Sequence, residues 1–129
     1  MQPAELDSNG NQKQAQEHNE LGKQSVASGD YQAGLESFFS AIDTDRGFAP
    51  AYINVAAVCL EIGDHEHAVI YAAKALELAP LERNIFMTCG RILAHSGHTD
   101  KARELYETYL LQFPGDHEIA QHLAELGTS

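Results

Sequence analysis

The sequence predicts an all-α fold made of a helical hairpin that recurs three times. Gly29, Gly63 and Gly97 follow one another at a constant step of 34 residues, and Pro80 and Pro114 keep the same step. Each glycine separates two segments in which apolar residues return at helical spacing. A helix–turn–helix unit with this period indicates stacked hairpins that bury a continuous core.

The domain boundaries follow from the same register. Residues 1–11 are polar and lack an apolar period, so we expect a flexible tail there, followed by one repeat domain over residues 12–129. The expected repeats span about residues 15–48, 49–82 and 83–116, and a capping helix spans about residues 116–126.

The first hairpin has the weakest pattern. Leu21 and Val26 give its first helix, expected from about residue 11 or 12 to 28, a thin apolar stripe. Gly29 ends this helix, and Asp30 can cap a second helix whose stripe includes Phe38. A thin stripe is typical of an edge helix with solvent on one side.

The later units are clearer. In the second hairpin, Tyr52 and Val55 mark the buried stripe of the first helix, and Ala68, Ala72 and Ala75 line a narrow second helix. Small side chains there allow close helix approach. The third hairpin repeats this plan, with Thr99 or His98 as the expected cap of its second helix. The last helix places its apolar residues inward and its polar residues outward: Ile119, Ala120, Leu123 and Leu126 against Glu118, Gln121, His122 and Glu125.

Composition excludes several functional classes. The chain has 43% apolar residues and a net charge of −11, without the basic patches that duplex nucleic acid or an anionic membrane requires. The longest apolar run, residues 55–60, is too short to span a bilayer, and no secretory signal is visible at the start. Cys59 and Cys89 fall on buried stripes, as expected of reduced thiols in the cytoplasm.

These residues resemble the tetratricopeptide repeat family over nearly the whole chain. The matching positions are Leu21, Gly22, Phe38 and Ala41 in the first unit, Tyr52, Ala68, Ala75 and Pro80 in the second, and Phe86, Gly90, Ala102, Tyr106 and Pro114 in the third. Departures are His18, Arg46, Cys59, Leu93 and Tyr109, and Tyr109 at a small-residue position is expected to loosen or tilt the last hairpin. The resemblance implies a right-handed superhelix of three repeats with a C-terminal capping helix.

The resemblance also implies a concave groove that binds a protein or peptide segment. The groove positions carried over to this chain are Asn19, Lys23, Ile53, Asn54, Ala57, Leu60, Asn84, Met87, Thr88, Arg91, His95 and His122. We expect this surface to hold an extended segment or a short amphipathic helix with one or two apolar anchors. Alternatively, Ile53 and Met87 only pack on neighbouring helices.

Some family members grip C-terminal carboxylates of chaperones with lysine, asparagine and arginine side chains. Asn54 occupies the matching place in the second unit, and Asn19 and Lys23 occupy those of the first with their types exchanged. Asn84 and Thr88 stand where the third unit would supply two cations. Without those charges, carboxylate capture loses its strongest hydrogen bonds, so we expect no such role, although Arg91 lies one turn away.

The remaining patterns point to binding rather than catalysis. Seven histidines include His65, His67, His95 and His98 near two equivalent turns, but their spacing does not favour a metal site. No catalytic motif is visible, so we expect neither an enzyme nor a cofactor. The leading interpretation is a cytoplasmic adaptor or scaffold. The alternatives are a secretion-type or co-chaperone that binds a client, and a self-assembling architectural subunit. Phe39 with Tyr71 is a candidate second contact or dimer surface.

Overall fold

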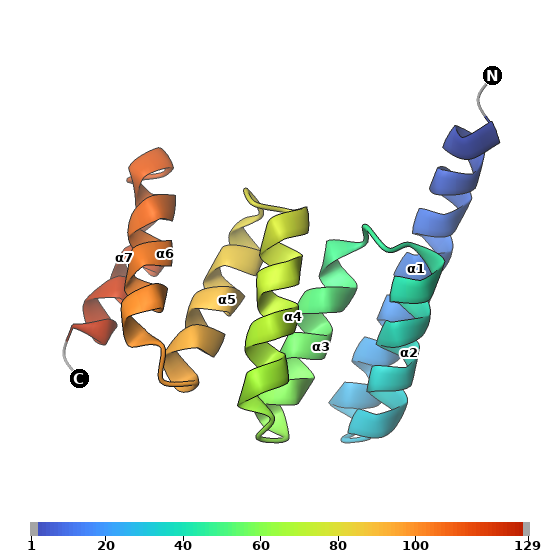
Figure 1. Cartoon of the computed structure of the whole chain (residues 1–129), viewed down its shortest axis with the longest axis horizontal. Helices are drawn as coiled ribbons and strands as arrows, with labels where there is room; N and C mark the ends of the chain where they lie inside the picture. Colours follow the sequence, from blue (N-terminus) through green and yellow to red (C-terminus); the bar gives the residue numbers. More distant parts are fainter. Residues whose placement is uncertain (1–2, 128–129) are drawn as a thin grey trace.

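The computed structural model describes residues 3–127, and over that range the chain is all helix and turn, without a strand. The helices are α1 (Pro3–Ala27), α2 (Tyr31–Thr44), α3 (Ala49–Glu61), α4 (His65–Leu78), α5 (Arg83–His95), α6 (Thr99–Gln112) and α7 (His117–Leu126). Figure 1 shows α2, α4 and α6 side by side across the near face, with α1, α3, α5 and α7 behind them. The hairpins are therefore stacked in two layers.

The first helix begins earlier than the sequence indicated. It starts at Pro3 instead of near residue 11, so residues 3–11, assigned to a flexible tail, continue α1; residues 1–2 lie outside the described range. Proline fits the first turn of a helix, and Ala4, Glu5 and Leu6 after it have good helix propensity, whereas residues 7–11 are Asp, Ser, Asn and Gly with low propensity and no apolar period. The early part of α1 projects past α2 (Figure 1).

The three repeated glycines occupy equivalent bends. Gly29, Gly63 and Gly97 have φ values of +86°, +87° and +87°, which side chains with a Cβ rarely adopt. After each glycine, the next backbone N–H donates back to a carbonyl of the preceding helix, for example Asp64 N to Cys59 O at 2.8 Å. This is the Schellman arrangement that ends a helix, and it confirms the predicted 34-residue register.

Aspartate caps begin most of the second helices. The side chain of Asp30 accepts from Ala33 N at 3.0 Å, and that of Asp64 accepts from His67 N at 3.2 Å. Asp116 caps the final helix in the same way. In the third hairpin His98 occupies the N-cap position of α6, but its side chain forms no hydrogen bond to the first turn of that helix.

Close helix contacts at glycines build the core. A Cβ on Gly22 would lie 2.5 Å from Cε1 of Phe38, so only glycine lets α2 approach α1 here. Gly90 gives Tyr106 the same room between α5 and α6, and Tyr106 is buried with its hydroxyl donating to Met87 O at 3.3 Å. Tyr109 is also buried, 5.1 Å from Phe86 between ring centroids.

A charged network fastens α7 to the third hairpin. Arg83 Nε donates to Asp116 Oδ2 at 2.6 Å, and its Nη2 donates to Glu118 Oε1 at 2.6 Å. The hydrogen bond from Arg83 is the largest of the effects that lower the pKa of Asp116 to about 2. Ile119 is fully buried in a cluster with Phe86, Tyr106 and Tyr109, so α7 closes the core as the predicted capping helix.

Candidate peptide-binding groove

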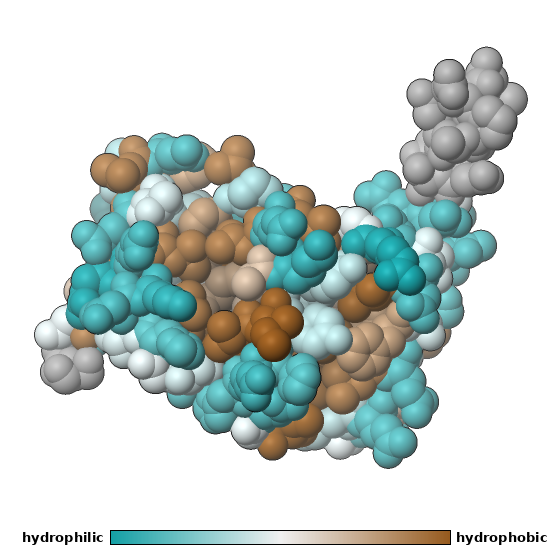
Figure 2. Space-filling view, in the orientation of Figure 1, coloured by the Kyte–Doolittle hydropathy of each residue, from teal (hydrophilic) through white to brown (hydrophobic). Residues whose placement is uncertain are grey.

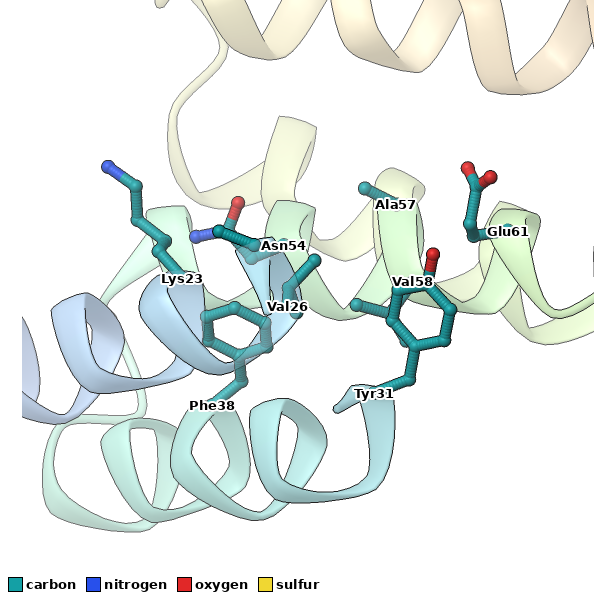
Figure 3. Close-up of a pocket in the computed structure, with 9 residues that line it drawn as sticks. Lys23, Val26, Tyr31, Phe38, Asn54, Ala57, Val58 and Glu61 are labelled. Carbon is teal, nitrogen blue, oxygen red and sulfur yellow. The ribbon is translucent and has the colours of Figure 1, made fainter. Parts of the chain in front are cut away.

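Two adjoining hollows follow the first helices of the hairpins. The larger has a volume of about 550 Å³ and lies between α1, the start of α3 and the start of α5. The smaller, about 360 Å³, lies between α1, the start of α2 and α3, and Figure 3 shows it. Both are lined by Lys23 and Asn54, so they meet at these residues. We call the two hollows together the groove.

A buried amide pair sets the orientation of Asn54. Its Nδ2 donates to Oδ1 of Asn19 at 2.8 Å, and Asn19 is only 5% exposed. Burying an amide is favourable only when it is hydrogen-bonded, and this contact supplies the partner. In Figure 3 the carbonyl oxygen of Asn54 points away from Phe38 and Val26, to the same side as the carboxylate of Glu61. Asn54 therefore presents an acceptor to the groove.

The charges around the groove are mainly negative. Asp45 and Glu82 line the larger hollow and Glu61 lines the smaller, whereas Lys23 is the one cation among the described lining residues. Lys23 Nζ also bonds Oε1 of Glu20 at 3.3 Å, which offsets part of its charge. The groove thus offers carboxylates and an amide oxygen, so it favours a ligand that donates hydrogen bonds.

The smaller hollow supplies an apolar surface. Val26, Tyr31, Phe38 and Val58 line its walls beside Ala57, and Lys23, Asn54, Ala57 and Glu61 project from its rim in Figure 3. Sequence reasoning assigned Ala57 to the groove but missed the other four. Val26 and Phe38 were placed on the buried stripes of the first hairpin, and Tyr31 and Val58 carried no assignment. A signal for two of them is the pair of helix glycines in this hairpin, because Phe38 packs at Gly22 and Val26 packs at Gly34.

Six of the other predicted groove positions fall into the same surface. Asn19, Lys23, Ile53, Asn54, Asn84 and Thr88 line the larger hollow. Ile53 is half-buried and packs against the main core cluster while it also lines the hollow. It therefore has both environments that the sequence suggested, the groove and the contact with neighbouring helices. Asn84 and Thr88 lie where a carboxylate-binding groove would carry cations.

Five predicted positions lie outside these hollows. Leu60 is half-buried against the core. Arg91 and His95 are exposed on α5, where His95 Nδ1 lies 2.8 Å from Arg91 O. Met87 is half-buried beside Tyr106, and His122 of α7 stacks on the same ring at 6.1 Å between centroids. Apart from Leu60 of α3, these residues belong to α5 and α7, and the role of all five in binding stays a prediction.

Other reactive groups do not gather into a site. Within residues 3–127, no three histidine, cysteine or acidic side chains are placed to share a metal ion. His65 Nδ1 lies 3.2 Å from Ser96 Oγ, and His67 is engaged by Asp64 at 2.9 Å. Burial raises the pKa of the Cys89 thiol to about 12, so this cysteine remains a neutral core residue.

Comparison with known proteins agrees with this geometry. One tetratricopeptide repeat model matches residues 49–80 and another matches residues 83–126, so the two together cover more than half of the chain. The chain belongs to the tetratricopeptide repeat family. Tetratricopeptide repeats are in general interaction modules without catalytic activity, so this membership indicates a protein-binding function. No helix in the described part of this tetratricopeptide repeat protein is long and apolar enough to cross a membrane.

Two curated relatives are much longer than this chain. DnaJ homolog subfamily C member 3 of Bos taurus is 28% identical over 111 residues, covering 86% of this chain and 22% of the relative. Small glutamine-rich tetratricopeptide repeat-containing protein 2 of Mycosarcoma maydis is 26% identical over 103 residues, covering 80% of this chain and 29% of the relative. The chain therefore spans about a quarter of the length of these proteins.

A solved structure has the same architecture. The second tetratricopeptide domain of human RPAP3, in complex with the HSP70 peptide SGPTIEEVD, superimposes with a TM-score of 0.79 at 24% identity. The match covers 91% of this chain and 98% of that domain. At this identity the similarity establishes the fold, an all-α superhelix of tetratricopeptide repeats.

Proposed function

We propose that this protein is an adaptor that binds a cationic segment of a partner protein in the groove. The observation that supports it best is the oriented Asn54 side chain in a groove that Asp45, Glu61 and Glu82 also line, with Lys23 as the only described lining cation. The apolar walls of the smaller hollow accept one apolar anchor of the segment. Both described cysteines are free thiols, which supports a cytoplasmic location.

The hydrogen-bond inventory gives the ligand its chemistry. A backbone N–H, a lysine or an arginine can donate to the Asn54 oxygen, and lysine or arginine can also pair with the three carboxylates. A C-terminal carboxylate meets only Lys23, which Glu20 already engages. Because Lys23, Glu61 and Glu82 are exposed, binding weakens as salt is added.

A second candidate function is a co-chaperone that binds acidic chaperone termini. The RPAP3 domain was solved with a peptide that ends in EEVD, which makes this candidate worth testing. The groove of this chain is poorly suited to such a ligand, because Asn84 and Thr88 supply no charge at the two places that face a carboxylate in the resembling proteins. We therefore rank it below binding of a cationic segment.

Matched peptides separate the two candidates. We expect SGPTIKKVK with an amidated C-terminus to bind at least about tenfold more tightly than SGPTIEEVD, measured by calorimetry at low salt. The double variant Asn84→Lys, Thr88→Arg adds two cations, and it should reverse this preference. Equal or stronger binding of SGPTIEEVD to the unaltered chain would reject the cationic ligand and favour the co-chaperone.

Single substitutions locate the binding surface. Asn54→Ala removes the acceptor and is expected to weaken binding of the basic peptide about 10- to 100-fold, the range for a hydrogen bond to a charged group. Gln112→Ala is the matched control, since it removes an exposed amide at the end of α6 that lines neither hollow, and it should leave the affinity unchanged. Unchanged affinity in Asn54→Ala would remove Asn54 from the site.

A further inference from the structure

A cleft separates the second helices of the last two hairpins, on the face opposite the groove. It has a volume of about 500 Å³ and is lined by Ala73 and Leu76 of α4, Phe86 of α5 and Leu105 of α6, among other mainly apolar residues. Figure 2 shows a hollow with brown, hydrophobic side chains between α4 and α6 on this face. We call it the α4–α6 cleft.

The repeat register explains why this boundary is open. At the preceding boundary, Phe39 of α2 meets Tyr71 of α4 with ring centroids 5.9 Å apart, and Tyr71 lies 6.4 Å from Tyr52 of α3. One repeat of 34 residues later, alanine takes the place of Phe39 and leucine takes the place of Tyr71.

These replacements remove side-chain volume where two helices would otherwise be bridged. The equivalent residues are Ala73 and Leu105, and both line the cleft, with Phe86 at the position of Tyr52. The α4–α6 cleft therefore lies at the position that the ring of Phe39 fills at the boundary between α2 and α4, and its floor is apolar in the same way. An apolar space of this kind gains free energy when a ring displaces water from it.

We propose that the α4–α6 cleft is a second docking site, which takes an amphipathic helix of a partner protein through one aromatic anchor. The anchor occupies the place above Ala73 that Phe39 occupies in the previous boundary. The rest of the helix lies along the cleft between α4 and α6. This site is independent of the groove, because the two share no lining residue.

The surface continues beyond the cleft in the direction a helix would follow. Leu111 lies one turn past Thr108, which lines the cleft, and its side chain is 85% exposed. Leu81 follows Pro80, another lining residue, and is 63% exposed. From Lys101 to Leu111 this stripe of α6 extends about 15 Å, which matches three turns of a docked helix. The two leucines give such a helix aliphatic contacts beyond the anchor.

The rim gives the partner helix a charge pattern. Lys101 and Glu104 both line the cleft, one turn apart on α6, and neither forms an ion pair with a described residue. They complement a helix with an acidic and a basic side chain one turn apart on the flank of the aromatic anchor. The occupant we infer is therefore a partner helix with one aromatic residue between opposite charges.

Filling the cleft from within tests its shape. Ala73→Phe restores the aromatic residue of the preceding boundary, and we expect it to raise the midpoint of thermal unfolding. Lys74→Phe is the control, because it adds the same ring at an exposed neighbour that does not line the cleft. The control should leave the midpoint unchanged or lower it. A lower midpoint for Ala73→Phe than for Lys74→Phe would overturn the aromatic-shaped site.

Binding is tested with a probe helix. The probe is an acetylated and amidated 12-residue helical peptide with one central Phe between a Glu and a Lys, and its twin has Ala in place of Phe. We expect the Phe peptide to shift the methyl resonances of Ala73 and Leu105, and to bind at least about tenfold more tightly than the twin.

The same titration separates the other occupants. Ala73→Phe should weaken probe binding at least about tenfold while leaving the affinity of the basic groove peptide unchanged. Equal binding of the two twin peptides, or unaltered probe binding by Ala73→Phe, would overturn the proposal. Light scattering without peptide provides a further check: a molar mass that rises with concentration in the unaltered chain and not in Ala73→Phe would assign the cleft to a second copy.

Discussion

The contact between α5 and α6 leads to a sharp prediction for Gly90→Ala. A Cβ at this position would overlap the ring of Tyr106, which is 1% exposed and cannot swing into solvent. Overpacking of this kind costs about 1–3 kcal/mol, and the better helix propensity of alanine offsets up to about 1 kcal/mol. We expect a net loss of about 1–2 kcal/mol in the free energy of unfolding. For a chain of this length, that corresponds to a midpoint lower by roughly 3–10 °C in thermal unfolding.

The matched control is Gly10→Ala, also within a helix. A Cβ on Gly10 meets no atom within 4 Å, so only the propensity gain remains, and the midpoint should stay unchanged or rise. The double variant Gly90→Ala, Tyr106→Leu should lose less stability than the two single losses added together, because leucine vacates the space. A midpoint for Gly90→Ala at or above that of the unaltered chain would refute the close approach of α5 and α6.

Three further predictions concern the turns and the cap. Arg83 holds the pKa of Asp116 at about 2, below its ordinary value of 3.8. The stabilisation from this pair is therefore present above pH 3.8 and is lost as the pH falls toward 2. In Asp116→Asn the midpoint of thermal unfolding should fall less steeply over that pH range. Gly63→Ala forces a Cβ into φ +87° and should cost about 1–2 kcal/mol in urea unfolding, whereas Gly115→Ala, where a Cβ meets nothing, should cost less. Ile119→Ala should cost about 2–5 kcal/mol, since this side chain of α7 is fully buried against the third hairpin. Stability equal to that of the unaltered chain would place α7 off the core.

The features that sequence predicted well depend on local constraints. A left-handed bend requires glycine, so the step between Gly29, Gly63 and Gly97 fixes the hairpin turns before any tertiary contact is known. Apolar periodicity then assigns the buried stripes, including Phe38 and Tyr106. These constraints act within a few residues of the chain, which is why the repeats and the capping helix could be placed.

The features that sequence missed depend on residues far apart in the chain. The Asn19–Asn54 hydrogen bond joins residues 35 positions apart, and nothing local to Asn19 indicates that its amide is buried. Arg83 reaches Asp116 over 33 positions. The start of α1 at Pro3 has no apolar signal, because that part of the helix projects beyond α2.

The cleft between α4 and α6 is a different kind of omission. Ala73 and Leu105 each look ordinary on a helix, and only their comparison with Phe39 and Tyr71 one repeat earlier reveals the missing volume. The register was visible in the sequence, but the distance between the helices that decides whether the space closes was not.

The most direct test of the account is a map of backbone and side-chain amide resonances during titration with the amidated basic peptide SGPTIKKVK. We predict that the largest shifts fall on Lys23, Asn54, Asn84 and Thr88 and include the side-chain amides of Asn19 and Asn54. Residues of the outer face, such as Ile70 and Lys74, should be unaffected. Saturable shifts confined to the outer face, or no shifts at millimolar peptide, would contradict a binding groove along α1, α3 and α5.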